Sequence, residues 1–217
     1  MADPQQKQKR GCLFYLGIIA VVSFLMLTLG AFFGLRYAKR MVNELTDAQP
    51  AQLPTVRLPE AQMFQLHDRV TTFRDGVRDG DAVEPLELTA DELNALVETD
   101  PAMASLKNHL FVTINSNQLG AQVSFPAQDL GLVSRRWQGR FVNATGVFDA
   151  AITTNELHIT AESLLVRGTP IPKIIMREIA AENLADKFNQ DPRTSAGLKK
   201  LQSIEVKDGK LIIVPKK

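Results

Sequence analysis

The sequence predicts an α+β protein, in which an N-terminal transmembrane helix precedes one soluble domain with helices packed on an antiparallel β-meander sheet. First, residues 11–35 carry no charge. Second, apolar residues after residue 60 recur at steps of three and four, and from Leu110 they alternate; these are the periods of helices and strands. Third, Asp208-Gly209 stands between two strand-like runs, which is typical of a β-hairpin.

The run 11–35 has the length and composition of a membrane anchor. A helix of 25 residues rises about 37 Å, and the hydrocarbon layer is roughly 30 Å thick. A cleaved signal peptide is the main alternative, but its apolar core usually has only about 7 to 15 residues. The residues expected to face lipid are Leu13, Phe14, Leu16, Ile18, Ile19, Val21, Val22, Phe24, Leu25, Leu27, Leu29, Phe32 and Phe33.

The flanks of this run bear on orientation and assembly. Three basic residues precede the run and three follow it, so the positive-inside rule gives no preference. The short leader favours a cytoplasmic N-terminus and an exported domain, which predicts a bacterial inner-membrane protein with its C-terminal domain outside the cytoplasm. Gly30 and Gly34 form a GxxxG pair, a candidate face for a homodimer of transmembrane helices.

We expect four segments: a basic leader (1–10), the transmembrane helix (11–35), a proline-containing stalk (36–59) and one α+β domain (60–217). Pro50, Pro54 and Pro59 interrupt regular structure in the stalk. Beyond the leader, the chain has 22 basic and 23 acidic residues, a balance that argues against nucleic acid as a partner. Cys12 is the only cysteine, so the domain contains no disulfide.

The first half of the domain is predicted to be helical. Apolar residues between Met63 and Val77 mark one face of a helix that begins near Glu60, and Gly76 and Gly80 are expected to end it. Further on, Thr89 and Glu92 have the spacing of a capping box. Asp100-Pro101 is expected to begin another short helix.

The second half is predicted to be a β-meander followed by helix and hairpin. Strands are expected over 110–114, 121–125, 142–152 and 157–166, and they are antiparallel because their connections are too short for crossovers. The apolar phase slips between Ala161 and Leu164, which indicates a β-bulge or a bend. A helix is expected over 171–188, a short segment over 192–201, and a hairpin over 204–214 with a type I′ turn at Asp208-Gly209.

No pattern in the chain predicts catalysis, a cofactor or a metal. His67, His109 and His158 are far apart and form no metal-type doublet. The nucleophile-elbow, phosphate-loop, HExxH and CxxC motifs do not occur. The carboxylate pairs Asp91/Glu92 and Glu178/Glu182 are explained by helix caps and solvated faces. We therefore expect a protein that is not an enzyme.

Two features are candidate binding surfaces. Three arginines surround the only tryptophan, a combination suited to anionic lipid head groups: Arg135, Arg136, Trp137 and Arg140. A solvated strand edge is the alternative. Small residues at Ala144, Gly146 and Ala150 leave room on one sheet face. An acyl chain could occupy that room, or the helix over 171–188 could fill it as ordinary core.

Two motifs stand out in the order of predicted segments: Leu88-Thr89-Ala90-Asp91-Glu92-Leu93-Asn94-Ala95-Leu96 before the meander, and Val166-Arg167-Gly168-Thr169-Pro170-Ile171-Pro172 after it. With the anchor, the stalk and the final hairpin, this order resembles the YpmS-like signal-anchored bacterial family over about residues 86–214. The resemblance implies an extracytoplasmic domain related in shape to tubular lipid-binding folds, and it brings no catalytic residue. We expect an envelope accessory protein that binds a lipid or a partner protein near the membrane. A structural adaptor without a small ligand is the alternative.

Overall fold

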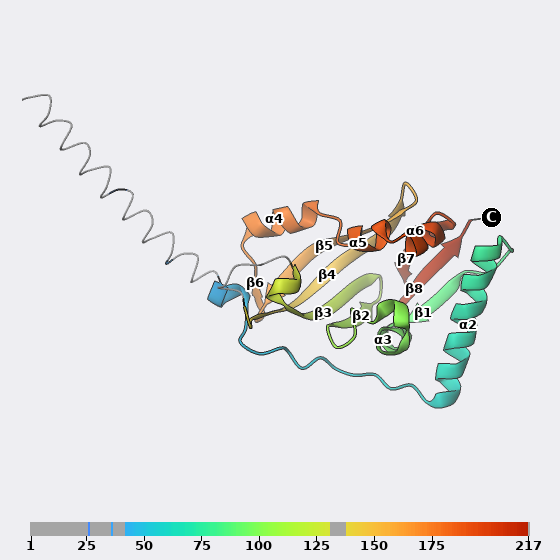
Figure 1. The fold of residues 1–217 in the computed structure, drawn as a ribbon, viewed down its shortest axis with the longest axis horizontal. Coiled ribbons are helices and arrows are strands. Elements are labelled where there is room, and N and C mark those ends of the chain that lie inside the picture. Colours follow the sequence, from blue (N-terminus) through green and yellow to red (C-terminus); the bar gives the residue numbers. More distant parts are fainter. Residues whose placement is uncertain (1–25, 27–35, 37–41, 131–137, 217) are drawn as a thin grey trace, which may run out of the picture. The chain divides into compact units, whose positions relative to one another are not determined.

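The computed structural model describes residues 26, 36, 42–130 and 138–216, and the chain forms two compact units, Met1–Glu44 and Leu45–Lys217 (Figure 1). In the first unit only Met26, Arg36 and residues 42–44 are described. The predicted lipid-facing residues, Gly30 and Gly34 all lie outside the described residues. Among those that are described, no helix combines the length and the apolar character needed to cross a membrane.

The second unit contains a five-stranded antiparallel meander, which confirms the predicted α+β class. Its strands follow each other in chain order: β2 (Leu110–Asn115), β3 (Gln118–Pro126), β4 (Phe141–Thr153), β5 (Glu156–Val166) and β6 (Thr169–Pro170). The predicted bulge is confirmed. Val147 lies opposite Ser163 and Phe148 opposite Ala161, so Glu162 is the extra residue in β5.

A second, three-stranded sheet has the order β1-β8-β7, with β1 (Leu86–Thr89), β7 (Leu201–Lys207) and β8 (Lys210–Pro215). Its hairpin confirms the prediction: Ile204 pairs with Ile213, and Asp208 and Gly209 have φ of +51° and +78°, as a type I′ turn requires. The separate sheet was not predicted, because β1 is short and reaches β8 only through the tertiary fold.

Two helices flank this smaller sheet, α2 (Glu60–Asp79) and α3 (Ala90–Thr99). The capping box at the start of α3 is confirmed, since Thr89 and Glu92 each accept a hydrogen bond from the other's backbone N–H, at 3.3 and 2.8 Å. The predicted short helix is a 3₁₀ turn (Pro101–Met103) capped by Asp100.

The prediction that Gly76 helps to end α2 is wrong. The helix continues through Gly76 and stops at Asp79, where Gly80 takes φ +83°. A Cβ on Gly76 would lie 2.3 Å from Cγ1 of Val83. Gly76 therefore lets the returning chain pack closely against the helix.

The prediction of one continuous helix over 171–188 is also wrong. The segment is divided into α4 (Lys173–Ala181) and α5 (Asp186–Gln190), and α6 (Pro192–Leu198) follows. Between the first two helices, Leu184 N–H donates to the Ile159 carbonyl at 2.9 Å, and Asn183 Oδ1 accepts from Ile159 N–H at 3.0 Å. The break occurs because these residues bond to the edge of β5.

Within the described residues, three apolar clusters form the core. The first joins α2, β1 and α3 around Leu66, Leu88 and Leu96, and the second surrounds Val77, Leu198 and Leu201. The third consists of Ala144, Val166 and Ile171, covered by Leu45, Val123, Val142, Leu164, Ile175, Met176 and Ile179. Helix α4 thus fills the room expected beside Ala144, and Leu164 lies 2.6 Å from the position of a Cβ on Gly146.

Candidate functional site

Residues 46–51, within the expected stalk, are attached to the large sheet. Asp47 exchanges two backbone hydrogen bonds with Phe141, each of 2.8 Å. Further along, Ala51 N–H donates to Ser124 Oγ at 3.1 Å and to Asn143 Oδ1 at 3.0 Å. Ser124 is fully buried beneath this segment. The segment therefore belongs to the domain that begins at Leu45.

Two arginines fix the start of this segment. Arg140 donates to the hydroxyl and the carbonyl of Thr46, at 2.5 and 2.8 Å. Arg167, at the turn before β6, donates to Asp47 Oδ1 at 2.6 Å and to the Thr46 carbonyl at 2.9 Å. The hydrogen bond from Arg167 lowers the pKa of Asp47 below its ordinary value, and the Asn143 amide acts in the same direction against a desolvation that raises it.

The predicted head-group cluster is only partly described. Arg135, Arg136 and Trp137 lie outside the described residues. The structure places Arg140 at the start of β4, where its guanidinium holds Thr46. Arg140 therefore has a role within the domain that the sequence pattern did not indicate.

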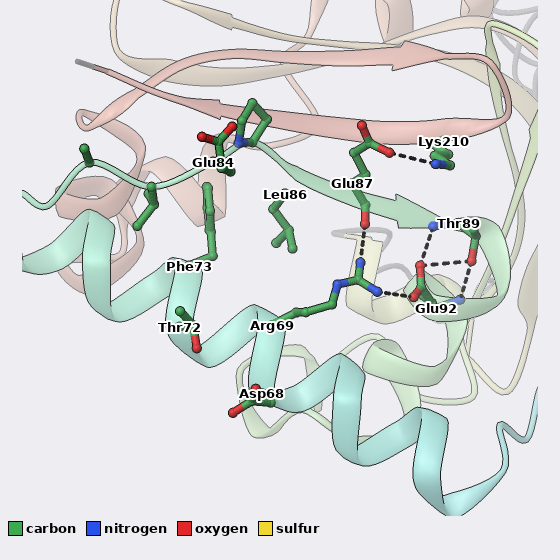
Figure 2. A pocket seen from close by; sticks show the side chains of 13 residues that line it. Asp68, Arg69, Thr72, Phe73, Glu84, Leu86, Glu87, Thr89, Glu92 and Lys210 are labelled. Carbon is green, nitrogen blue, oxygen red and sulfur yellow. Dashed lines mark hydrogen bonds and ion pairs between the residues drawn. The ribbon is translucent and has the colours of Figure 1, made fainter.

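An open groove of about 790 Å³ lies between α2 and β1 (Figure 2). Arg69 reaches across it from α2, with Nη1 2.7 Å from Glu92 Oε1 and Nη2 2.5 Å from the Glu87 carbonyl. Lys210 of β8 bonds Glu87 Oε2 at 2.7 Å. The groove is lined by Asp68, Arg69, Thr72, Phe73, Ala82, Val83, Glu84, Pro85, Leu86, Glu87, Thr89, Glu92 and Lys210.

The groove is acidic, since four carboxylates line it against two cations. Lys210 lowers the pKa of Glu87, and Glu87 in turn raises the pKa of Lys210. For Glu92, burial raises the pKa, but the Thr89 N–H and Arg69 outweigh it and the net shift is downward. Glu87 and Glu92 are therefore ionised at neutral pH, and each is paired with a cation of the groove, Lys210 and Arg69 respectively.

A second groove of about 490 Å³ lies between β4 and β7, at the Ala150 end of the sheet face expected to hold an acyl chain. Phe148 and Ala150 contribute to it from β4, and Ile204 and Val206 from β7. Asp149, Glu162, Glu205 and Lys207 also line it. This mixed, open lining differs from the enclosed apolar cavity that a buried lipid chain requires.

The three histidines occupy separate places in the domain. His67 lies 3.3 Å from Thr99 Oγ1. His109 bonds the Ser124 carbonyl at 2.6 Å and stacks on Phe125 with a ring-centroid distance of 5.1 Å. His158 is in β5. Across residues 42–130 and 138–216, no group of three metal-type ligands comes together.

Comparison with known protein families, curated proteins and solved structures gives no match for this chain. The likeness to the YpmS-like family therefore stays an expectation from the sequence motifs.

Sequence reasoning missed a set of asparagines that close the edges of the large sheet. Asn94 of α3 bonds the backbone of Val112 in β2, while Asn183 and Asn189 bond the backbone of Leu157 in β5. One signal was present: Asn94 is a polar residue within the apolar stripe of α3, beside Leu93 and Leu96. For the other two, no local pattern indicates the role.

Proposed function

We propose that this chain is a membrane-anchored, non-enzymatic accessory protein of a bacterial envelope, whose domain binds a lipid surface or a partner protein beside the bilayer. The observation that carries the proposal is the short distance in sequence between the charge-free run 11–35 and a domain that begins at Leu45. The nine residues between them span at most about 32 Å at roughly 3.5 Å per residue. An anchored domain would therefore work close to the membrane.

The two grooves favour a surface or a partner over an enclosed lipid chain. Both are open, and charged side chains line both. The acidic groove between α2 and β1 is complementary to a basic segment of a partner protein, and such complementarity supports both specificity and fast association. In the alternative, a structural adaptor without a small ligand, the same faces would serve assembly alone.

Membrane topology is the first test. The full chain is expressed in a bacterium as a fusion with alkaline phosphatase at its C-terminus. The phosphatase is expected to be active, and the fusion is expected to resist extraction from membranes with alkaline carbonate. As a control, Val22→Lys with Leu25→Lys should release the chain, because each central lysine costs roughly 2.5 to 3.5 kcal/mol of insertion free energy. Inactive phosphatase together with an active cytoplasmic reporter would overturn the exported orientation, and a freely extractable chain would overturn the anchor.

The kind of ligand is tested on the purified full chain. Lipid extraction followed by mass spectrometry shows whether a lipid copurifies in stoichiometric amount. Such a lipid would contradict the proposal that the domain binds a lipid surface or a partner protein rather than an enclosed lipid chain. A photo-crosslinker at Thr72, which lines the acidic groove, is expected to capture a partner in cells. The matched control is Thr71, an exposed neighbour that is not part of the groove lining. Equal cross-linking from both positions would argue against the groove as the binding site.

A further inference from the structure

We propose that the outer face of α4 rests on the bilayer surface, with Ile174 in the interface and Lys173 and Arg177 against anionic head groups. The inference rests on the proposed function, since it assumes that the run 11–35 anchors the chain. It assigns the contact to a lipid surface and to one face of one helix.

Helix α4 has one side in the core and one side in solvent. Ile175, Met176 and Ile179 pack on the cluster of Ala144, Val166 and Ile171. Steps of three and four residues place Ile174, Arg177, Glu178 and Ala181 on the opposite side, and all four are exposed. Ile174 is 62% exposed, one of only a few large apolar side chains so open within the described part of the chain.

The order of the charges along α4 destabilises the helix itself. A helix dipole favours anions at the N-terminus and cations at the C-terminus. Here Lys173 begins the helix, Arg177 follows one turn later, and Glu178 and Glu182 lie toward its end. Pro172 at the N-cap gives no side-chain hydrogen bond. Charges that do not stabilise their own helix point to a role in contacts with another surface. An exposed isoleucine between two cations is typical of helices that lie in the membrane interface.

The path of the chain identifies the bilayer as the surface. Leu45, the first residue of the domain, packs on the same cluster as the inner face of α4. The chain therefore enters the domain at the cluster that α4 covers, and α4 lies over the end of the large sheet where β6 is found (Figure 1). Nine residues separate Leu45 from the charge-free run, a reach of at most about 32 Å. Lys173 and Arg177, in the first turns of α4, supply the charge complementarity for anionic lipid, and Glu178 and Glu182 follow them toward the end of the helix.

The test uses the full chain in vesicles of phosphatidylcholine with about one third phosphatidylglycerol. Cys12 is the only cysteine, so a Cys12→Ser background allows an environment-sensitive fluorophore to be attached at Ile174→Cys. Phe64→Cys is the matched control, because Phe64 is 75% exposed and belongs to α2, which packs beside the smaller sheet. Nitroxide-labelled lipid is expected to quench the label at 174 at least twofold more than the label at 64.

Charge variants separate head-group binding from chance proximity. Lys173→Glu with Arg177→Glu should remove most of the extra quenching, as should high salt, because exposed charges are screened over about 8 Å at physiological ionic strength. Lys199→Glu with Lys207→Glu makes the same change of charge at other exposed lysines and should leave the quenching as it is. Ala181→Cys, a smaller change on the same face, repeats the measurement if a label at 174 disturbs folding.

The outcomes distinguish this inference from the proposed function. If the chain is integral to the vesicles but positions 174 and 181 are quenched no more than position 64, the contact by α4 is overturned and the anchored accessory protein stands. If the chain does not insert into vesicles at all, both proposals fail.

Discussion

The side-chain amide of Asn94 pairs with the backbone of Val112 as a neighbouring strand would. Asn94 Oδ1 accepts from Val112 N–H at 2.7 Å, and Nδ2 donates to the Val112 carbonyl at 2.8 Å. On β5, Asn189 makes the equivalent pair with Leu157, accepting from its N–H at 3.0 Å and donating to its carbonyl at 2.8 Å, and Asn183 bonds Ile159 N–H and the Leu157 carbonyl beside it. Unpaired strand edges promote aggregation. Asparagines thus protect β2 and the part of β5 that lies beyond its pairing with β6.

Replacing Asn94 should destabilise the domain strongly. Asn94 is buried, so Asn94→Ala leaves the N–H and carbonyl of Val112 without their partners and is expected to cost about 2 to 3 kcal/mol of unfolding free energy. Urea denaturation measures the loss. Asn115→Ala, at an exposed position at the end of β2, is the control and should change stability by less than about 0.5 kcal/mol. Similar values for both variants would show that the edge pairing contributes little.

The domain should depend on residues 45–58. The amphipathic pattern alone places its start near Pro59, and a piece of residues 59–217 is expected to fold as a soluble monomer. The structure predicts that a piece of residues 45–217 melts at a clearly higher temperature, because only it keeps Thr46, Asp47 and Ala51 over the buried Ser124. Calorimetry compares the two. Equal melting temperatures would mean that the attached segment does not stabilise the domain.

Acid should weaken the attachment at Asp47. Its pKa is lowered in the folded domain, chiefly by Arg167, so its stabilisation is present above the unfolded value of about 3.9 and is lost as pH falls through the lower folded value. Asp47→Asn should therefore reduce stability at pH 7 and make it less dependent on pH between about 5 and 2. Denaturation midpoints across this range give the test, with the exposed Asp149→Asn as control. If the stability of Asp47→Asn falls with pH as steeply as that of the wild type, the ionised Asp47 does not stabilise the attachment.

The terminal hairpin should require glycine at position 209. Gly209 has φ +78°, and a Cβ there would meet no atom within 4 Å, so the cost of Gly209→Val is backbone strain alone. We expect a loss of about 1 kcal/mol or more. Gly197→Val is the matched control in α6, where a Cβ also has open space and φ is not positive. Near-wild-type stability of Gly209→Val would argue against the tight turn.

Local sequence patterns predicted those elements whose cause is local. The capping box at Thr89, the turn at Asp208-Gly209 and the bulge near Glu162 each follow from the residues within a few positions. The single helix over 171–188 failed for the opposite reason. Its apolar spacing continues through Leu184, but the edge of β5 offers Asn183 and Leu184 hydrogen bonds that a continuous helix would forgo.

The sequence by itself determined the α+β class, the antiparallel order of the meander and the charge-free run before the domain, because periodicity, turn chemistry and hydropathy act over short stretches of chain. Only the tertiary structure decided where the domain begins, which residues close the sheet edges and how the grooves are charged. Arg140, Arg167 and Asp47 are separated by up to 120 residues and meet only after the strands have paired. Contacts of this kind depend on which backbone groups the fold leaves unpaired, and no local pattern records that.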